Sequence, residues 1–385
     1  MKILSVILCC LLLAGCAARS PETVPTTAPP ETAASVPSTT VSTEPPETEP
    51  VKDVIDRTID GMSLEQRVGQ LFLARCNKET VITDLSQYHL GGLVLFGEDF
   101  EGQTPETMTE LLTSYQAAAD YPLLLAVDEE GGDVTRISRN SAFREKRFSS
   151  LRARWNRGGL ETVLSEEEEK CQLLTGLGIN VNLGPVCDIA TDSGAFLYSR
   201  SLGQDAETTS QVVSAIVNLM SQNHIGSVLK HFPGYGNNAD THTGIAQDSR
   251  SLAELEGKDL LPFAAGIQAG CGAVMVGHVI VEAMDGSLPA SLSPAVHEYL
   301  RNTMGFTGVI MTDDLVMQAI TDQYGAGEAA VMAVLAGNDL LCSTEYATQY
   351  QAVLQAVLDG RISVDILNAA VRHVLVWKQQ VASYG

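Results

Sequence analysis

Short apolar runs recur between residues 51 and 385 and predict buried β-strands. Each run holds five or six mostly apolar residues, without the strict alternation of a sheet that has one face in water. Runs of this kind are typical of parallel strands covered on both faces. The eight runs lie at residues 69–74, 91–96, 123–128, 179–183, 226–230, 272–276, 308–312 and 338–342.

Helix-like stretches separate these runs. Pro105 and Ser293 suit the first positions of a helix, and Gly337 suits the residue that follows one. Eight strands that alternate with helices predict a single (β/α)8 barrel, an α/β fold. A doubly wound open sheet remains the structural alternative. The helix-like stretches lie at residues 105–119, 206–222, 252–268, 293–304 and 328–336.

The first sixteen residues read as an export signal. Lys2 precedes an apolar run of about eleven residues, too short to span a bilayer and typical of a secretory signal. The run ends in Leu-Ala-Gly-Cys16, which resembles a bacterial lipobox. We therefore expect Cys16 to be lipidated and to hold an exported protein at the outer face of the cell membrane. An ordinary cleaved signal is the alternative.

Residues 17–50 are rich in Pro, Thr, Ser and Glu and predict a disordered tether. Such a segment cannot bury enough apolar surface to offset the entropy of ordering it. The whole chain is 45% hydrophobic, too apolar for general disorder. Residues 51–385 are therefore expected to form one catalytic domain, which we expect to be a monomer.

The charge balance narrows the possible partners. Asp and Glu number 47 against 24 Lys and Arg, a net charge of −23. Phosphate binding needs clustered Lys and Arg, so nucleic acid is excluded as a partner. Electrostatic adhesion to an anionic membrane is also disfavoured, which leaves the lipid on Cys16 as the expected membrane contact. A neutral sugar remains compatible with this charge.

The cysteines of the predicted domain favour buried free thiols. They are five in number and contain no Cys-x-x-Cys pair, so neither a disulfide framework nor a structural zinc site is expected. These residues are Cys76, Cys171, Cys187, Cys271 and Cys342.

Ionisable side chains follow five successive predicted strands, the third to the seventh. In a (β/α)8 barrel the carboxyl ends of all strands face one mouth, where the active site lies. Any one of these residues could be an ordinary loop cap, but together they predict a catalytic mouth. In chain order they are Asp128, Asp188, Lys230 with His231, His278, and Asp313 with Asp314.

Several ordered motifs carry a resemblance to a known family. They are VDEEGG at 127–132 with Arg136, NLGPVCD at 182–188, SRSLG at 199–203, KHFPGYG at 230–236 with DTH at 240–242, PASLS at 289–293 and GFTGVIMTDDL at 305–315. Over roughly residues 55–380 the sequence resembles the β-N-acetylglucosaminidase branch of the family 3 glycoside hydrolases. The resemblance implies a (β/α)8 barrel. Tyr235 stands where this branch usually carries His, so how this loop is held is open.

The resemblance implies a retaining glycosidase with two catalytic groups. Asp313 matches the nucleophile, which forms a covalent glycosyl-enzyme. Asp314 better suits the cap of the following helix. Related β-glucosidases usually take their acid from a Glu in a second domain, but this chain ends soon after the eighth strand. His242, oriented by Asp240, matches the acid/base of the branch, because a His can give and take a proton near neutrality.

The resemblance also implies the residues that bind the sugar. Asp188 and His278 would support the site. No metal or cofactor is expected, because Asp240-x-His242 lacks the ligand number of a metal site and no nucleotide-binding glycine fingerprint follows a strand. The residues implied at the −1 subsite are Asp128, Arg136, Arg200, Lys230 and His231.

The sequence thus predicts an exo-acting, retaining β-N-acetylglucosaminidase that removes terminal GlcNAc from cell-wall fragments or chitooligosaccharides. A phosphorylase is one alternative, because a His acid/base would not repel phosphate as a carboxylate would. A β-glucosidase or xylosidase of the same family is another, disfavoured by the Asp240 and His242 pair. A non-catalytic sugar-binding lipoprotein is the rival from another class, disfavoured by the presence of Asp313 and His242.

Overall fold

The computed structural model describes residues 53–238, 244 and 246–382. Its centre is a parallel sheet in the order β10-β1-β2-β3-β4-β5-β7-β9. A small parallel pair, β6 (Gln247–Asp248) and β8 (Ile280–Val281), lies apart from it. The central strands are β1 (Phe72–Arg75), β2 (Gly92–Leu95), β3 (Leu124–Val127), β4 (Val181–Asn182), β5 (Gly226–Phe232), β7 (Ala273–Val276), β9 (Val309–Thr312) and β10 (Leu341–Ser343).

The two edge strands of this sheet meet and close it into a barrel. Met311 and Leu340 form a parallel bridge between β9 and β10. The N–H groups of Asp339 and Leu340 donate to the Ile310 carbonyl at 2.8 and 3.2 Å. Each of the eight predicted runs contains or overlaps one of these strands. The predicted (β/α)8 barrel is confirmed, and the open doubly wound sheet is excluded.

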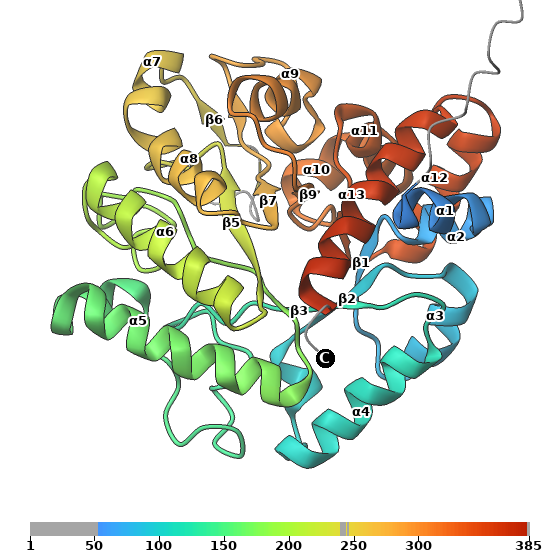
Figure 1. The fold of residues 1–385 in the computed structure, drawn as a ribbon. Coiled ribbons are helices and arrows are strands. Elements are labelled where there is room, and N and C mark those ends of the chain that lie inside the picture. Colours follow the sequence, from blue (N-terminus) through green and yellow to red (C-terminus); the bar gives the residue numbers. More distant parts are fainter. Residues whose placement is uncertain (1–52, 239–243, 245, 383–385) are drawn as a thin grey trace, which may run out of the picture. The chain divides into compact units, whose positions relative to one another are not determined.

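Helices surround the barrel (Figure 1). The α-helices are α1 (Val54–Gly61), α2 (Leu64–Gly69), α3 (Val81–Tyr88), α4 (Pro105–Ala118), α5 (Leu151–Leu177), α6 (Ala206–Gln222), α7 (Leu252–Glu254), α8 (Leu260–Gln268), α9 (Pro294–Glu298), α10 (Gln318–Tyr324), α11 (Ala326–Ala336), α12 (Tyr346–Leu358) and α13 (Val364–Ala382). Short 3-10 helices η1 (Gly97–Phe100) and η4 (Ala290–Leu292) and single π-turns η3 (Leu255–Asp259) and η5 (Tyr299–Thr303) complete the set.

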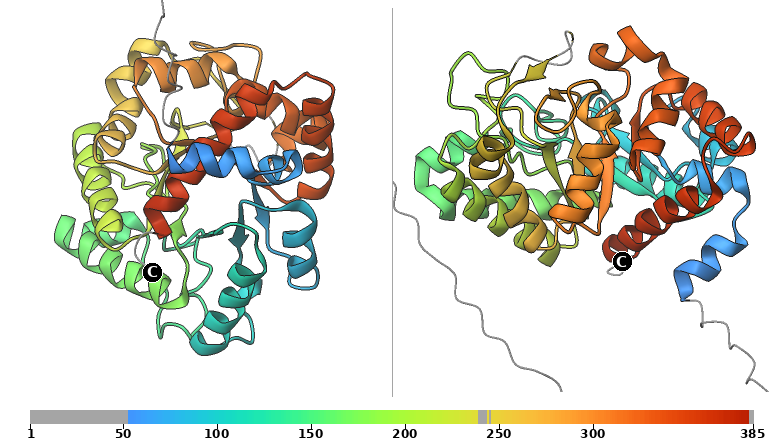
Figure 2. Two further views of the ribbon diagram at one scale, coloured as in Figure 1. Left: turned by 45° about the vertical axis from the view of Figure 1, so that its right-hand side comes forward. Right: turned by 90° about the horizontal axis from the view of Figure 1, so that it is seen from above.

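Helix α13 closes the amino-terminal end of the barrel (Figure 2). Its Val374 and Trp377 belong to the same buried cluster as the inward-facing strand residues. Trp377 packs against the backbone at Gly272, where an added Cβ would lie 2.0 Å from the indole Nε1. Only glycine allows this approach. Because one end of the barrel is filled, the carboxyl ends of the strands are left to form the site.

Candidate active site

The carboxyl ends of the strands surround a cavity of about 810 Å³. This volume lies in the range of ligand-binding pockets in proteins. The structure therefore brings together the predicted nucleophile and all five residues implied at the sugar subsite. The charged or ionisable lining residues include Asp128, Arg136, Arg200, Lys230, His231 and Asp313.

Lys230, on β5, is almost completely buried between two carboxylates. Its Nζ lies 2.6 Å from Asp128 Oδ1 and 2.7 Å from Glu130 Oε1. Arg200 makes a bidentate pair with Glu130, with Nε–Oε2 at 2.9 Å and Nη2–Oε1 at 2.6 Å. These ion pairs orient both cations toward the cavity at fixed positions, as a site that recognises sugar hydroxyls requires.

Glu130 is a site residue that was not expected from the sequence. Burial alone would raise the pKa of its carboxyl, but the charges of Arg200 and Lys230 outweigh burial and hold the pKa far below the usual range. Glu130 is thus the ionised partner of both cations. The sequence held one signal that could have indicated Glu130. Arg200 and Lys230 were expected in one subsite with Asp128 and Asp313 as the only carboxylates, so a further acidic partner for these cations was missing.

The neighbouring acid, Glu129, shapes the loop that follows β3. Its carboxylate is buried and accepts hydrogen bonds from the N–H groups of Arg136 and Ile137, both at 2.8 Å. Gly131 adopts a φ of +106°, and a Cβ there would lie 2.2 Å from the Ser149 carbonyl oxygen, so the turn requires glycine. The loop returns Arg136 to the site, with its Nη2 3.7 Å from Asp128 Oδ2.

Asp188 lies beneath the cavity and orients His231. Its Oδ2 accepts from the His231 backbone N–H and faces His231 Nδ1, both at 2.9 Å. Arg200 Nη2, which can only donate, lies 3.3 Å from His231 Nε2. Nε2 therefore accepts, and the ring proton sits on Nδ1 toward Asp188. Tyr235 donates its backbone N–H to Asp188 Oδ1 at 2.7 Å and packs edge-on against His231.

His278 is buried behind the strand end that carries Asp313. Its Nε2 lies 3.0 Å from the Asp314 carbonyl oxygen, to which it donates, and its Nδ1 lies 2.7 Å from Ser291 Oγ. The Asp313 N–H donates to the Val276 carbonyl at 3.1 Å, which continues the pairing of β9 with β7. These contacts fix the backbone of residues 313 and 314 relative to the barrel.

The pKa values of the two adjacent carboxyls, Asp313 and Asp314, are shifted in opposite directions. Burial opposes ionisation of Asp313, but His231, His278 and the Asp314 N–H outweigh it and lower the pKa of this carboxyl. Burial dominates at Asp314 and raises its pKa. The surroundings therefore favour ionisation of Asp313, whereas burial opposes it at Asp314.

Asp314 does not cap the following helix, so that expectation was wrong. Helix α10 begins at Gln318, and its N-cap residue is Met317, with no side-chain cap. Asp314 instead accepts from Thr344 Oγ1 at 2.6 Å and from the Val316 N–H at 3.2 Å. Asp314 cannot cap the helix because three residues separate the two. Its side chain instead connects the loop after β9 to the loop after β10.

The predicted acid/base pair, Asp240 and His242, lies outside the described residues. The described flank after that segment is anchored to the loop that follows β5, and the flank before it is anchored to the loop that follows β4. Arg250 Nη2 donates to the Gly234 carbonyl at 3.0 Å. Asn237 Oδ1 accepts from the N–H groups of Thr191 and Asp192 at 3.2 and 3.3 Å. Among residues 53–238, 244 and 246–382, no group of three His, Cys, Asp or Glu side chains is arranged to hold a metal ion.

An ionised carboxylate at the mouth of a (β/α)8 barrel, surrounded by fixed donors and acceptors, is the arrangement of a barrel enzyme that acts on a polar substrate. Residues 63–376 match the family profile of the glycosyl hydrolase family 3 N-terminal domain. The chain belongs to glycosyl hydrolase family 3 and is a glycoside hydrolase.

Individual relatives agree with this assignment. The chain is 32% identical over 301 residues to a beta-hexosaminidase of Nitrosomonas eutropha, covering 74% of this chain and 84% of the relative. It is similar to a family 3 beta-N-acetylglucosaminidase structure from Paenibacillus sp. FPU-7, with a TM-score of 0.79 and 32% identity, over 84% of this chain and 64% of that chain. A beta-N-acetylhexosaminidase from Beutenbergia cavernae matches with a TM-score of 0.74 and 25% identity, over 82% and 98% of the two chains.

Proposed function

We propose that the protein is an exo-acting, retaining β-N-acetylglucosaminidase that hydrolyses terminal non-reducing β-GlcNAc from cell-wall fragments or chitooligosaccharides. The observation that carries the proposal is the position of Asp313. Its carboxylate lines the same cavity as Asp128 and Lys230, and its lowered pKa keeps it ionised. Relatives named beta-hexosaminidase and beta-N-acetylglucosaminidase support the choice of sugar.

In the proposed reaction, the terminal sugar binds with its hydroxyls toward Asp128, Lys230 and Arg200. Asp128 accepts hydrogen bonds, and the two cations donate them. The Asp313 carboxylate attacks the anomeric carbon as the bond to the leaving oxygen breaks, which gives a covalent glycosyl-enzyme. Water then cleaves this ester with a second inversion, so that the sugar leaves with its original configuration.

We assign the proton transfers to His242, oriented by Asp240. His242 would protonate the leaving oxygen in the first step and deprotonate water in the second. The described flank before this segment is compatible with the role. It begins directly after β5, and His231 of that strand lines the cavity.

His242→Ala should separate substrates by their leaving groups. We expect kcat/KM for chitobiose to fall by about 10²–10⁴-fold, because an alkoxide leaves poorly without a proton. For 2,4-dinitrophenyl β-GlcNAc the fall should be much smaller, since that phenolate departs without protonation. His373→Ala is the matched control, because His373 also pairs with an aspartate, Asp339, but lies on α13. Equal losses on both substrates would contradict the assignment.

The activity itself is tested with the purified protein on aryl β-GlcNAc and aryl β-glucoside, with and without phosphate. We expect hydrolysis of the GlcNAc substrate to free sugar, without dependence on phosphate. Activity on the glucoside alone would overturn the sugar assignment. Formation of a sugar phosphate would identify a phosphorylase, and binding of GlcNAc without turnover would identify a sugar-binding protein.

We further propose that the protein is exported and held at the outer face of the cell membrane by a lipid on Cys16, with residues 17–50 as a tether. Among the residues described, no helix is long and apolar enough to cross a membrane. We also propose that the protein acts as a monomer. In cells fed an alkyne-bearing fatty acid, the protein should carry the label, and Cys16→Ala should lose it. An unlabelled wild-type protein would refute the anchor.

A further inference from the structure

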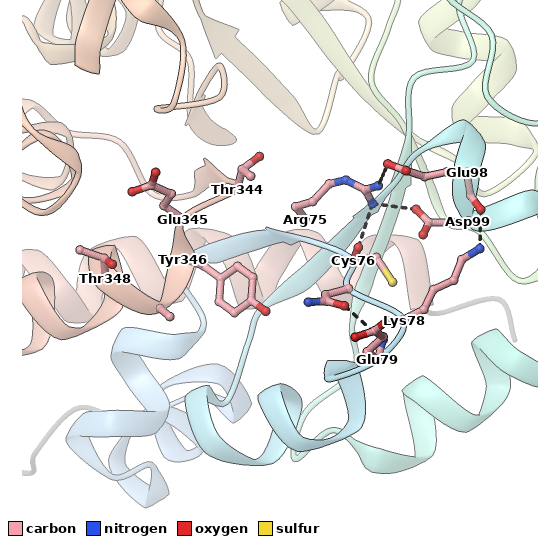
Figure 3. Close-up of a pocket in the computed structure, with 12 residues that line it drawn as sticks. Arg75, Cys76, Lys78, Glu79, Glu98, Asp99, Thr344, Glu345, Tyr346 and Thr348 are labelled. Carbon is pink, nitrogen blue, oxygen red and sulfur yellow. Dashed lines mark hydrogen bonds and ion pairs between the residues drawn. The ribbon is translucent and has the colours of Figure 1, made fainter. Parts of the chain in front are cut away.

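A second cavity of about 620 Å³ adjoins the first at the same end of the barrel. Its walls are the segments that follow β1, β2 and β10 (Figure 3). Arg75, Glu98 and Thr344 line both cavities. The two spaces are therefore adjacent, with these three residues forming a shared wall.

Arg75, the last residue of β1, forms the fixed part of this shared wall. Its Nη1 donates to Asp99 Oδ2 at 2.8 Å and to the Cys76 carbonyl at 2.9 Å, and its Nη2 pairs with the Glu98 carboxylate. The guanidinium also stacks on the Phe96 ring, 4.2 Å from the centroid. These contacts hold Arg75 in place and compensate its charge within the wall.

Thr344 and Tyr346 form the opposite side of the second cavity (Figure 3). Thr344 Oγ1 donates to Asp314 Oδ2 at 2.6 Å, which connects this wall to the residue next to the nucleophile. Tyr346 donates its hydroxyl to Asp84 at 2.7 Å, so the ring is held in one orientation. The second cavity is thus built from side chains with defined positions and adjoins the cavity that holds Asp313.

The charged groups around the second cavity are mainly negative. Four acidic residues and two basic ones line it. Arg75 pairs with Glu98 and Asp99, and Lys78 donates to the neutral Glu98 carbonyl, so these six residues together carry a net charge of −2. The side chains of Glu79, Glu98 and Glu345 remain exposed. A carboxylate entering this space would meet like charges, whereas an ammonium would be attracted.

We propose that the second cavity binds the leaving-group sugar and selects a neutral or amine-bearing unit over a carboxylate-bearing one. This inference rests on the proposed function: an exo-enzyme holds the terminal GlcNAc beside Asp313, and the leaving-group sugar must lie in an adjoining space, which we assign to the second cavity. It narrows the substrate to chitooligosaccharides, including partly deacetylated ones. Cell-wall disaccharides, in which the second sugar carries a lactyl carboxylate, are disfavoured.

The test compares kcat/KM for three β-1,4-linked disaccharides that share the terminal GlcNAc. The second sugar is GlcN, GlcNAc or MurNAc. At low ionic strength we expect GlcN to be preferred over MurNAc by about three- to tenfold, because each exposed charge contributes modestly. The preference should shrink in 0.5 M salt as the charges are screened.

A double variant, Glu79→Gln with Glu345→Gln, should reduce the ratio between the GlcN and MurNAc substrates toward one. The matched control is Glu161→Gln with Glu328→Gln, which removes two exposed charges elsewhere and should keep the wild-type ratio. Equal rates on all three disaccharides, or a preference for MurNAc, would overturn this inference while hydrolysis of aryl β-GlcNAc upholds the proposed function. Loss of aryl hydrolysis in the wild type would instead refute the proposed function.

Discussion

Asp313→Asn should lower kcat by about 10⁴-fold or more, as loss of a covalent nucleophile does in other hydrolases. The amide has the same shape as the carboxylate but cannot form the glycosyl ester. The fold should be retained, because Asn can still accept the Asp314 N–H bond, which is 2.9 Å long in the wild type. Initial rates on aryl β-GlcNAc and the thermal unfolding midpoint are the two measurements.

Asp314→Asn provides the neighbouring comparison for this prediction. Asp314 lines the same cavity, but its carboxyl is bonded to Thr344 and Val316 and its pKa is raised by burial. We expect a clearly smaller loss of kcat than in Asp313→Asn. Equal losses in the two variants, or near wild-type activity of Asp313→Asn, would show that the nucleophile is misassigned.

Glu130→Gln should lower kcat/KM by about 10²-fold, because Arg200 and Lys230 would no longer be held in position beside the sugar. It should also destabilise the fold by about 3–5 kcal/mol, because removing one partner of a buried ion pair leaves an uncompensated charge. Here Arg200 loses its bidentate carboxylate partner, and Lys230 loses one of its two. The kcat/KM for aryl β-GlcNAc and urea unfolding measure the two effects.

The pH dependence of this variant has a defined sign. The pKa of Glu130 is lower in the folded than in the unfolded protein, so its stabilising effect is present above the unfolded pKa and is lost as the pH falls. The stability difference between wild type and Glu130→Gln should therefore be full at pH 7 and shrink in acid. Glu169→Gln is the control, because Glu169 makes a similar bidentate pair with Arg144 on the surface, where the expected cost is about 0–1 kcal/mol. A similar loss in both variants would contradict the role of Glu130.

The strands of this fold could be predicted because each is a short apolar run between polar loops. Helix α5, which a kink divides into two helical parts, was not predicted. Its residues Gly158 and Gly159 have non-helical backbone angles, and acidic residues follow them. These features weaken the helical periodicity that the sequence would otherwise show. The closure of the barrel base by Trp377 depends on contacts between distant segments and has no local signal.

The site could be predicted where chemistry coincides with a strand end, as at Asp128, Lys230 and Asp313. The different roles of Glu129 and Glu130 could not be predicted in this way. They are adjacent and chemically equal in the sequence, yet one binds backbone N–H groups and the other binds two cations. The second cavity was not predicted either. The first predicted strand ended one residue before Arg75, so this residue was not recognised as part of a strand end at the barrel mouth.

The central claim is that Asp313 forms a covalent bond to the sugar. A 5-fluoro-N-acetylglucosaminyl fluoride should trap that intermediate, since the ring fluorine slows both its formation and its hydrolysis, while the good fluoride leaving group keeps formation the faster step. Peptide mapping by mass spectrometry after this reaction should place one added glycosyl group on Asp313. A label on another residue, or no label together with a product of inverted configuration, would contradict the account.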